Sequence, residues 1–349
     1  MTDAPHHDAH SYDAPHHDAH RRDTAATAEN RSRLAPADRP TVSFELFPPR
    51  TTDGERHLVG TLHALEQARP DFVSVTYGAS GRTRVTTRRL VTQILHTTSL
   101  TPIAHLTCVD TSRDETVAIV EEFLDAGVRS FLALRGDPPA GQVDWHPHPD
   151  GLHNAAQLVG LLRAVEAERC ARSQAQVVRG LVKPLSVAVA AFPRGNHATG
   201  GTRADDVRAL LAKQHAGADF AITQIFFDAP SYLALVAEAR EAGVTIPIIP
   251  GILPATDPER LARVGRLAGV TPPPDLMARL GSLDDPQAQH RAGVEATAAL
   301  VEAVLTGGAP GIHVYTFNQH RPALDLLSAT RLGGRPSAPA ASPGDPSVP

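Results

Sequence analysis

The chain has 349 residues, of which 42% are hydrophobic, and this length and apolar content predict one large α/β barrel or two smaller domains with a sizeable core. Its formal net charge of -5 and isoelectric point near 6.4 disfavour a nucleic-acid-binding protein, because such proteins usually carry a basic stripe. No apolar stretch is long enough to span a bilayer and the N-terminus has no signal-peptide core, so we expect a soluble cytoplasmic protein.

Residues 1–39 are predicted to form a disordered, His-rich tail. Within them the octapeptide Asp-Ala-Pro-His-His-Asp-Ala-His occurs twice, at 3–10 and 13–20, and a repeat this short and polar cannot bury a core. Its side chains could bind a transition metal weakly, although a solvated tail is the simpler interpretation. Residues 333–349, rich in Pro, Ala and Ser, are predicted to be a second loose tail. The folded body is therefore expected at residues 40–332.

The first predicted strand, Thr41–Phe47, carries a single carboxylate, Glu45, and is ended by Pro48-Pro49. A strand that is buried on both faces has no favourable place for an ionised glutamate, so we expect Glu45 where the strand opens into a cleft. Burial there would raise the pKa of Glu45 and make it a proton donor near neutral pH. An edge strand with Glu45 facing water is the alternative.

Seven further β-rich runs follow, separated by amphipathic stretches. Several of these stretches end in Ala-Gly, which is typical of a helix that ends at a left-handed glycine. Eight strands alternating with helices favour a (β/α)8 TIM barrel, with extra helix in Pro273–Leu305. A doubly wound sheet is the alternative, but no Gly-x-Gly-x-x-Gly joins a strand to a helix. The later strands are predicted at Asp71–Tyr77, Pro102–Cys108, Ser130–Arg135, Leu185–Phe192, Phe220–Phe226, Ile246–Ile249 and Gly311–Phe317, and the clearest helices at Glu55–Ala68, Arg113–Ala126, Ala204–Ala216 and Ser231–Ala242.

Polar residues recur at the carboxyl ends of the predicted strands, where the catalytic groups of such barrels gather. Each alone has an ordinary interpretation, such as a hydrogen-bonded core histidine, a surface turn or an amide bonded to the backbone. Six consecutive strands that bring a polar group to one rim favour a site instead. The set has no tight metal-ligand motif, so no metal is predicted, and its carboxylates could form a proton-handling pair. Its members are Glu45, Thr76, His105, Arg135, Asp137, His197 and Gln224.

Seven short motifs, taken together, resemble the methylenetetrahydrofolate reductase family. They occur in the family's order and span nearly the whole predicted body. Each motif alone is weak, whereas seven in order are specific. They are Phe44-Glu45-Leu46-Phe47-Pro48-Pro49, Val73-Ser74-Val75-Thr76-Tyr77-Gly78, His105-Leu106-Thr107-Cys108, Leu134-Arg135-Gly136-Asp137-Pro138-Pro139, Ala218-Asp219-Phe220-Ala221-Ile222-Thr223-Gln224, Ile249-Pro250-Gly251-Ile252-Leu253-Pro254 and His313-Val314-Tyr315-Thr316-Phe317-Asn318.

The resemblance implies a flavin-bearing barrel that reduces 5,10-methylenetetrahydrofolate to 5-methyltetrahydrofolate and so supplies methyl groups for methionine synthesis. NADH or NADPH would pass hydride to FAD and leave, and the folate would then bind the same face and accept the hydride. The expected partner is thus the small-molecule folate, with no nucleic acid and no membrane, and a homo-oligomer is left open.

The resemblance also assigns residues to roles, with Glu45 and Asp137 as the catalytic pair. Glu45 matches the general acid that protonates the departing nitrogen when the five-membered ring opens to an iminium. Asp137 matches the carboxylate that holds the pterin near the flavin, and its charge would stabilise the iminium. The amide of Gln224 offers a donor and an acceptor to a pterin edge, and Gln319 falls at another substrate position. The flavin-contacting positions are Thr76, Tyr77, Ala79, His105, Arg135, Gly136, Asp137, Ala155, His197, Asp206 and Lys213, of which Lys213 and Arg135 would offset the pyrophosphate charge.

Two departures from the family pattern concern the flavin. Asn154 stands where the family often has Tyr, so one aromatic contact is missing. Ala209 and Ala212 stand where the family can have Asn and Arg, so the flavin phosphates would be held less tightly unless Arg208 compensates. These departures motivate a flavin-free reductase of the same folate as the nearest alternative.

Two further departures lie elsewhere. Gln319 replaces the usual Arg, with Arg321 two residues on, which puts that substrate contact in doubt. Glu166–Lys183 is longer and more basic than the family usually shows, and we interpret it as a surface insertion, with a partner-binding site as the alternative. Another barrel oxidoreductase or lyase, and a non-catalytic folate-binding subunit, are the more distant functional alternatives.

Overall fold

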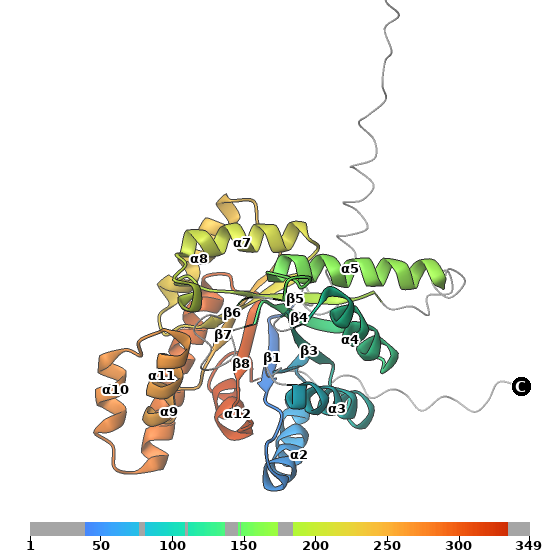
Figure 1. Cartoon of the computed structure of the whole chain (residues 1–349). Coiled ribbons are helices and arrows are strands. Elements are labelled where there is room, and N and C mark those ends of the chain that lie inside the picture. Colours follow the sequence, from blue (N-terminus) through green and yellow to red (C-terminus); the bar gives the residue numbers. More distant parts are fainter. Residues whose placement is uncertain are drawn as a thin grey trace, which may run out of the picture.

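The computed structural model describes residues 39–76, 81–108, 111–136, 146, 148–173 and 184–333. Eight parallel strands form a closed barrel in chain order, and helices surround it (Figure 1). The predicted TIM barrel is therefore confirmed. The predicted tails lie outside the described residues, apart from positions 39 and 333 at their edges. The strands are β1 (Thr41–Leu46), β2 (Phe72–Val75), β3 (Pro102–Thr107), β4 (Ser130–Leu134), β5 (Ser186–Ala191), β6 (Phe220–Ile225), β7 (Ile248–Ile252) and β8 (Gly311–Tyr315).

The helices begin and end where the sequence chemistry requires. Ser112 and Thr202 each form a capping box with the acidic residue three positions later, at the start of α4 and α7. Gly127, Gly217 and Gly243 follow helices with positive φ, as the Ala-Gly pattern predicts. The helices are α2 (Thr52–Gln67), α3 (Gly81–Thr97), α4 (Arg113–Asp125), α5 (Ala155–Arg172), α7 (Arg203–His215), α8 (Ala229–Glu241), α9 (Pro258–Ala268), α10 (Pro274–Gly281), α11 (Pro286–Thr306) and α12 (His320–Ser328), with a short 3-10 turn, η1 (His197–Thr199).

Strand β7 differs most from its prediction, since it begins two residues later than expected and continues through Pro250 and Gly251 to Ile252. Pro and Gly disfavour the interior of a strand, so the predicted strand ended at Ile249, before Pro250 and Gly251. In the barrel, Gly251 packs so closely on β6 that an added Cβ would lie 2.1 Å from the Thr223 carbonyl oxygen. Close backbone approach therefore explains the glycine.

The predicted surface insertion at Glu166–Lys183 begins inside a regular helix, so its N-terminal boundary is wrong. Helix α5 continues to Arg172, and Glu166 accepts a hydrogen bond from the Leu185 backbone N–H at 2.6 Å. Arg163 donates to Glu166 and to Asp219, which ties α5 to the strand layer. Residues 174–183 lie outside the described part of the chain.

The barrel interior is filled with side chains, so a ligand must bind at an end and not in a central pore. Phe72 and Phe220 pack at 5.6 Å between ring centroids, and His313 stacks on Phe72 at 5.9 Å. A larger apolar layer lies between the strands and the helices. None of the described helices is long and apolar enough to cross a membrane.

Candidate active site

A cavity of about 710 Å³ opens at the carboxyl ends of the strands, and it gathers most of the residues that the sequence predicted for a site. Because all eight strands are parallel, their carboxyl ends share one rim, and polar residues far apart in the chain meet there. Tyr77, Ala79 and Asp137 lie outside the described residues. The predicted residues that line the cavity are Glu45, Thr76, His105, Arg135, Gly136, Ala155, His197, Asp206, Lys213 and Gln224.

Glu45 lies at the floor of this cavity with only 6% of its surface exposed. Its Oε2 atom is 3.7 Å from His105 Nε2 and 3.9 Å from His313 Nε2. Burial raises the pKa of Glu45 to about 7, and the opposing effect of His105 is smaller. The carboxyl group therefore holds a proton for part of the time at neutral pH, as the strand pattern predicted.

The two histidines beside Glu45 are neutral at the same pH. Burial lowers the pKa of His105 to about 4, and attraction to Glu45 opposes this only partly. Burial also lowers the pKa of His313, to about 3. His105 lines the cavity, but its Nε2 atom is buried and has no hydrogen-bond partner among the described residues. Such an orphaned nitrogen fits a site that receives a polar ligand group.

Sequence reasoning missed His313, which two serines hold in the barrel interior. Ser43 Oγ lies 2.8 Å from His313 Nδ1 and 3.2 Å from the Ile312 carbonyl oxygen, while Ser74 Oγ lies 3.3 Å from His313 Nε2. If Ser43 donates to the carbonyl, Nδ1 carries the ring proton and Nε2 accepts from Ser74. Part of this arrangement could be predicted from the sequence, because Ser43 and Glu45 are two positions apart and therefore lie on the same face of β1. The pairing of Ser43 with His313 could not, because it depends on closure of the barrel between β1 and β8.

Lys213 and Asp206 of α7, together with the backbone at the end of β5, form a charged wall of the cavity. Lys213 is 8% exposed, and its Nζ donates to the Ala190 carbonyl oxygen at 2.7 Å. Asp206 is 5% exposed and accepts from the Phe192 backbone N–H at 2.7 Å. Burial lowers the pKa of Lys213 and raises that of Asp206, and each group partly offsets this for the other. A cation and an orphaned imidazole nitrogen in one cavity suit the anionic and polar parts of a flavin cofactor.

The residues that depart from the family pattern have local roles on this wall. Asn154 begins α5, where its side chain accepts from the Gln157 backbone N–H at 3.0 Å, and it lines the cavity. Ala209 lines the cavity, whereas Ala212 is exposed on α7. Arg208 is not among the described residues that line the cavity, but it pairs with Asp205, which is. In this arrangement the Arg208 guanidinium is therefore engaged by a carboxylate at the cavity.

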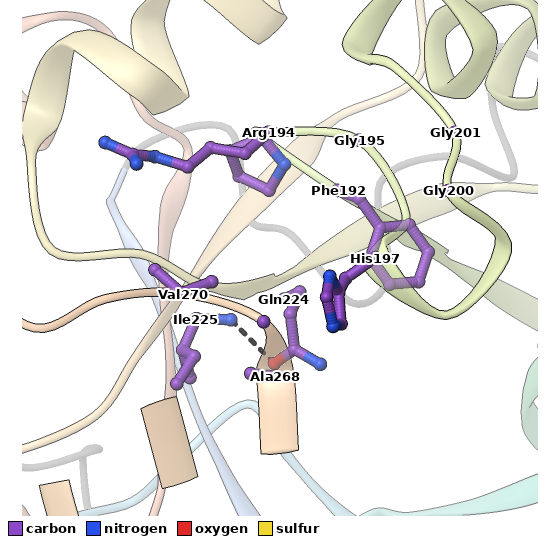
Figure 2. Close-up of a pocket in the computed structure, with 12 residues that line it drawn as sticks. Phe192, Arg194, Gly195, His197, Gly200, Gly201, Gln224, Ile225, Ala268 and Val270 are labelled. Atoms are coloured by element: carbon purple, nitrogen blue, oxygen red, sulfur yellow. Dashed lines mark hydrogen bonds between the residues drawn. The ribbon is translucent and has the colours of Figure 1, made fainter. Parts of the chain in front are cut away.

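Gln224 reaches the cavity from the end of β6, but half of its amide is already engaged. Its Oε1 accepts from the Ile225 backbone N–H at 2.8 Å, and the amide nitrogen points away from that bond (Figure 2). The amide oxygen thus already accepts one hydrogen bond, which leaves its second lone pair and the N–H₂ group for a ligand, and the expected pterin contact stays a prediction. His197, from the β5–α7 connection, lies beside Gln224 and lines the same space.

Gln319 is not among the described residues that line the cavity. Its Oε1 accepts from Arg260 Nη1 at 2.7 Å, and the Arg260 guanidinium lies 6.0 Å from the centroid of the Phe317 ring. That ring stacks on Phe47, a cavity residue, at 5.1 Å. Arg321, the other cation considered from the sequence, is 67% exposed and pairs with Asp325 on α12.

No cluster of three or more His, Cys, Asp or Glu side chains within the described parts of the chain is arranged to hold a metal ion.

The cavity combines a buried acid of raised pKa, neutral imidazoles and a charged wall. Such a cavity can donate a proton to one part of a ligand while it binds anionic groups elsewhere.

Comparison with known proteins gives one family. The family model for methylenetetrahydrofolate reductase matches residues 30–331. The chain is 33% identical over 312 residues to the 5,10-methylenetetrahydrofolate reductase of Pectobacterium carotovorum, covering 88% of this chain and 95% of the relative. It is 34% identical over 297 residues to the enzyme of Escherichia coli, covering 84% and 91%.

Among solved structures, the chain is similar to an uncharacterized protein from Clostridium thermocellum that binds two copies of 5-methyl-5,6,7,8-tetrahydrofolic acid. The TM-score is 0.53, the sequence identity is 13%, and the match covers 86% of this chain and 96% of that one. At this identity the likeness concerns the barrel fold alone.

Proposed function

The chain belongs to the methylenetetrahydrofolate reductase family, and on that premise we propose that it reduces 5,10-methylenetetrahydrofolate to 5-methyltetrahydrofolate with FAD and NADH or NADPH. The observation that carries the proposal is the buried Glu45, which lies at the floor of the cavity of about 710 Å³ and has a pKa of about 7. Supply of methyl groups for methionine synthesis, in the cytoplasm, is the cellular role that goes with this reaction.

Glu45 is the proton donor in this reaction. Opening of the five-membered ring breaks a carbon–nitrogen bond, and the departing nitrogen takes a proton from the Glu45 carboxyl group, which leaves a cationic iminium and a carboxylate. Hydride then adds to the iminium carbon to give the methyl group. The pKa values of His105 and His313 lie well below that of Glu45, so neither histidine takes the Glu45 proton, and as neutral rings they do not repel the developing cation.

Asp137 and Gln224 hold the pterin in this proposal. The role of Asp137 rests on the Leu134-Arg135-Gly136-Asp137-Pro138-Pro139 motif alone, since Asp137 lies outside the described residues. Its carboxylate would bind the donor edge of the pterin and stabilise the iminium charge. Gln224 would supply a donor, because its amide oxygen is bonded to Ile225.

The charged wall would hold FAD. Lys213 and Arg135 would offset the negative charge of the pyrophosphate, and His105 would offer its unpartnered Nε2 to the same ligand. When bound, FAD accepts hydride from the reduced nicotinamide and delivers it to the folate. Thr76, Gly136, Ala155, His197 and Asp206 complete the proposed contacts, together with Tyr77 and Ala79, which lie outside the described residues.

Gln319 would act together with Arg260 on the folate tail. The glutamate of a folate carries two carboxylates that are ionised at neutral pH, and they need a cation where the ligand leaves the cavity. Arg260 is held by Gln319 beside the Phe317–Phe47 stack and forms an ion pair with Asp257 at 3.6 Å. A guanidinium has five N–H donors, so Arg260 could also bind a folate carboxylate, in place of the family's arginine at position 319.

A flavin-free reductase of the same folate remains the second candidate, favoured by Ala209 and Asn154 in the cavity wall. An anaerobic visible absorption spectrum separates the two. The proposal predicts a flavin spectrum that bleaches with NADH and returns when methylenetetrahydrofolate is added. A colourless protein that still oxidises NADH with the folate would support the flavin-free reductase. A protein that is inactive but binds the folate would support the non-catalytic alternative.

A further inference from the structure

Strand β6 carries a β-bulge at the cavity rim. Ile222 pairs with Ile249 of β7, but the next aligned pair is Ile225 with Gly251. Three steps along β6 therefore correspond to two along β7, which leaves one extra residue at Thr223–Gln224. Bulges of this kind re-aim side chains next to active sites.

The bulge fixes the orientation of the Gln224 side chain. The Ile225 backbone N–H donates to Gln224 Oε1 at 2.8 Å (Figure 2). A glutamine amide normally has two nearly equivalent orientations, but this bond selects the one with the oxygen toward the main chain. The amide N–H₂ group is then the half that can donate to a ligand in the cavity.

Three groups hold the bulge itself. The Tyr315 hydroxyl donates to the Thr223 carbonyl oxygen at 2.9 Å, and Thr223 Oγ1 accepts from the Gly251 backbone N–H at 2.9 Å. A Cβ on Gly251 would lie 2.1 Å from the Thr223 carbonyl oxygen and 2.7 Å from Tyr315 Cε2. Only glycine at position 251 therefore lets β7, the bulge and the Tyr315 ring come together.

We propose that Tyr315 is a positioning residue for substrate recognition: its hydroxyl holds the β6 bulge, so that Gln224 presents its N–H₂ group to a hydrogen-bond acceptor, a carbonyl oxygen or unprotonated ring nitrogen of the pterin. The ligand class rests on the proposed function, whereas the bulge does not. Tyr315 also lines the cavity, but its hydroxyl is bonded to the Thr223 carbonyl oxygen, so in this proposal it acts through Gln224 and not by its own contact. Its removal therefore weakens folate binding only while Gln224 is present.

A double-mutant cycle tests this proposal. The dissociation constant of 5-methyltetrahydrofolate is measured for the parent, Tyr315→Phe, Gln224→Ala and the double variant. Loss of one neutral hydrogen bond corresponds to roughly a 5- to 10-fold weaker affinity. We expect that loss in Gln224→Ala, a similar or smaller loss in Tyr315→Phe, and no further loss in the double variant. Independent, additive losses would mean that Tyr315 touches the ligand itself and would overturn the proposal.

Tyr232→Phe is the matched control. The Tyr232 hydroxyl also donates to a backbone carbonyl, that of Ile248 at 2.8 Å, but Tyr232 is a buried residue of α8 and is not among the described residues that line the cavity. It should lose comparable stability and keep the parent affinity. Equal weakening of folate binding in Tyr232→Phe and Tyr315→Phe would also overturn the proposal, because both effects would then be structural.

Amide hydrogen exchange measures the stability of the bulge without any ligand. It therefore tests the positioning role of Tyr315 separately from the proposed folate-reductase function. The Ile225 amide should exchange faster in Tyr315→Phe and in Gln224→Ala than in the parent or in Tyr232→Phe. Unchanged exchange in Tyr315→Phe would contradict its positioning role even if folate binds well. A parent that binds no folate would contradict the proposed function, while faster exchange in Tyr315→Phe would still support the part played by Tyr315.

Discussion

The floor and the charged wall of the cavity both bury titratable groups, but they differ in the groups that oppose the effect of burial. On the floor, Glu45, His105 and His313 are buried together, and burial moves every pKa toward the neutral form. On the wall, Lys213 and Asp206 are also buried, but each stabilises the charge of the other and bonds to a backbone group. Burial is the largest effect on the pKa in both places, but on the wall the backbone hydrogen bonds of Asp206 and Lys213 act together with their mutual attraction against it. One cavity can therefore combine proton transfer with anion binding.

Glu45→Gln should produce the largest effect, because it removes the proton donor and leaves the wall intact. Loss of a general acid typically lowers a rate by roughly 10²- to 10⁴-fold. We expect that loss in the reduction of methylenetetrahydrofolate, measured by rapid mixing with pre-reduced enzyme. Bleaching of the flavin by NADH should remain near the parent rate. Equal losses in both half-reactions would show that Glu45 is not the acid.

The same substitution should change how stability depends on pH. The pKa of Glu45 is raised in the folded state from 4.5 to about 7, so its contribution is present below pH 4.5 and is lost as pH rises through 7. This difference between the folded-state and ordinary pKa corresponds to about 3 kcal/mol. Relative to the parent, Glu45→Gln should gain about that much free energy of unfolding between pH 4.5 and 8.5, measured by urea denaturation. A constant difference across this range would contradict the raised pKa.

Lys213→Met tests the charged wall and should act on cofactor affinity. Hydrogen bonds to charged groups contribute about 1.5–3 kcal/mol, so FAD should bind roughly 10- to 100-fold more weakly in a fluorescence titration of the apoprotein. Arg279→Ala is the control, since Arg279 pairs with Glu295 between α10 and α11 and neither is among the described residues that line the cavity. Equal FAD affinity in both variants would mean that the pyrophosphate lies elsewhere.

Arg260→Gln should give the smallest effect, because Arg260 is not among the described residues that line the cavity and reaches it only through the Phe317–Phe47 stack. Loss of a partly exposed cation opposite a carboxylate should raise the KM for the folate by roughly 5-fold with little change in kcat. An analogue without the glutamate tail should be insensitive to the substitution. Arg260→Gln combined with Gln319→Arg should recover the affinity, and Arg321→Ala should match the parent. Failure of the exchange to restore affinity would argue against Arg260 as the tail cation.

Sequence reasoning succeeded where a feature depends on neighbours in the chain. The eight strands, the glycines that end helices and the raised pKa of Glu45 all follow from local patterns, because a carboxylate in an apolar strand that ends at Pro-Pro has few favourable places. The ordered motifs supplied the family and the proposed ligands.

Sequence reasoning failed where a feature depends on contacts between distant segments. Ile222-Thr223-Gln224-Ile225 has the pattern of a regular strand, and its bulge arises from Gly251 and Tyr315, which lie on other strands. His313 meets Glu45 only because β8 closes the barrel against β1. Arg260 and Gln319 are separated by 59 positions, so their pairing has no local signature.

The most direct test of the account is the pH dependence of the two half-reactions, measured in single turnovers between pH 5 and 9. If Glu45 donates the proton, the rate of folate reduction should fall above about pH 7 in the parent, and this transition should be absent from the residual rate of Glu45→Gln. Flavin reduction by NADH should lack this transition in both proteins. The same transition near pH 7 in Glu45→Gln, or in the NADH half-reaction, would contradict the assignment of the buried acid.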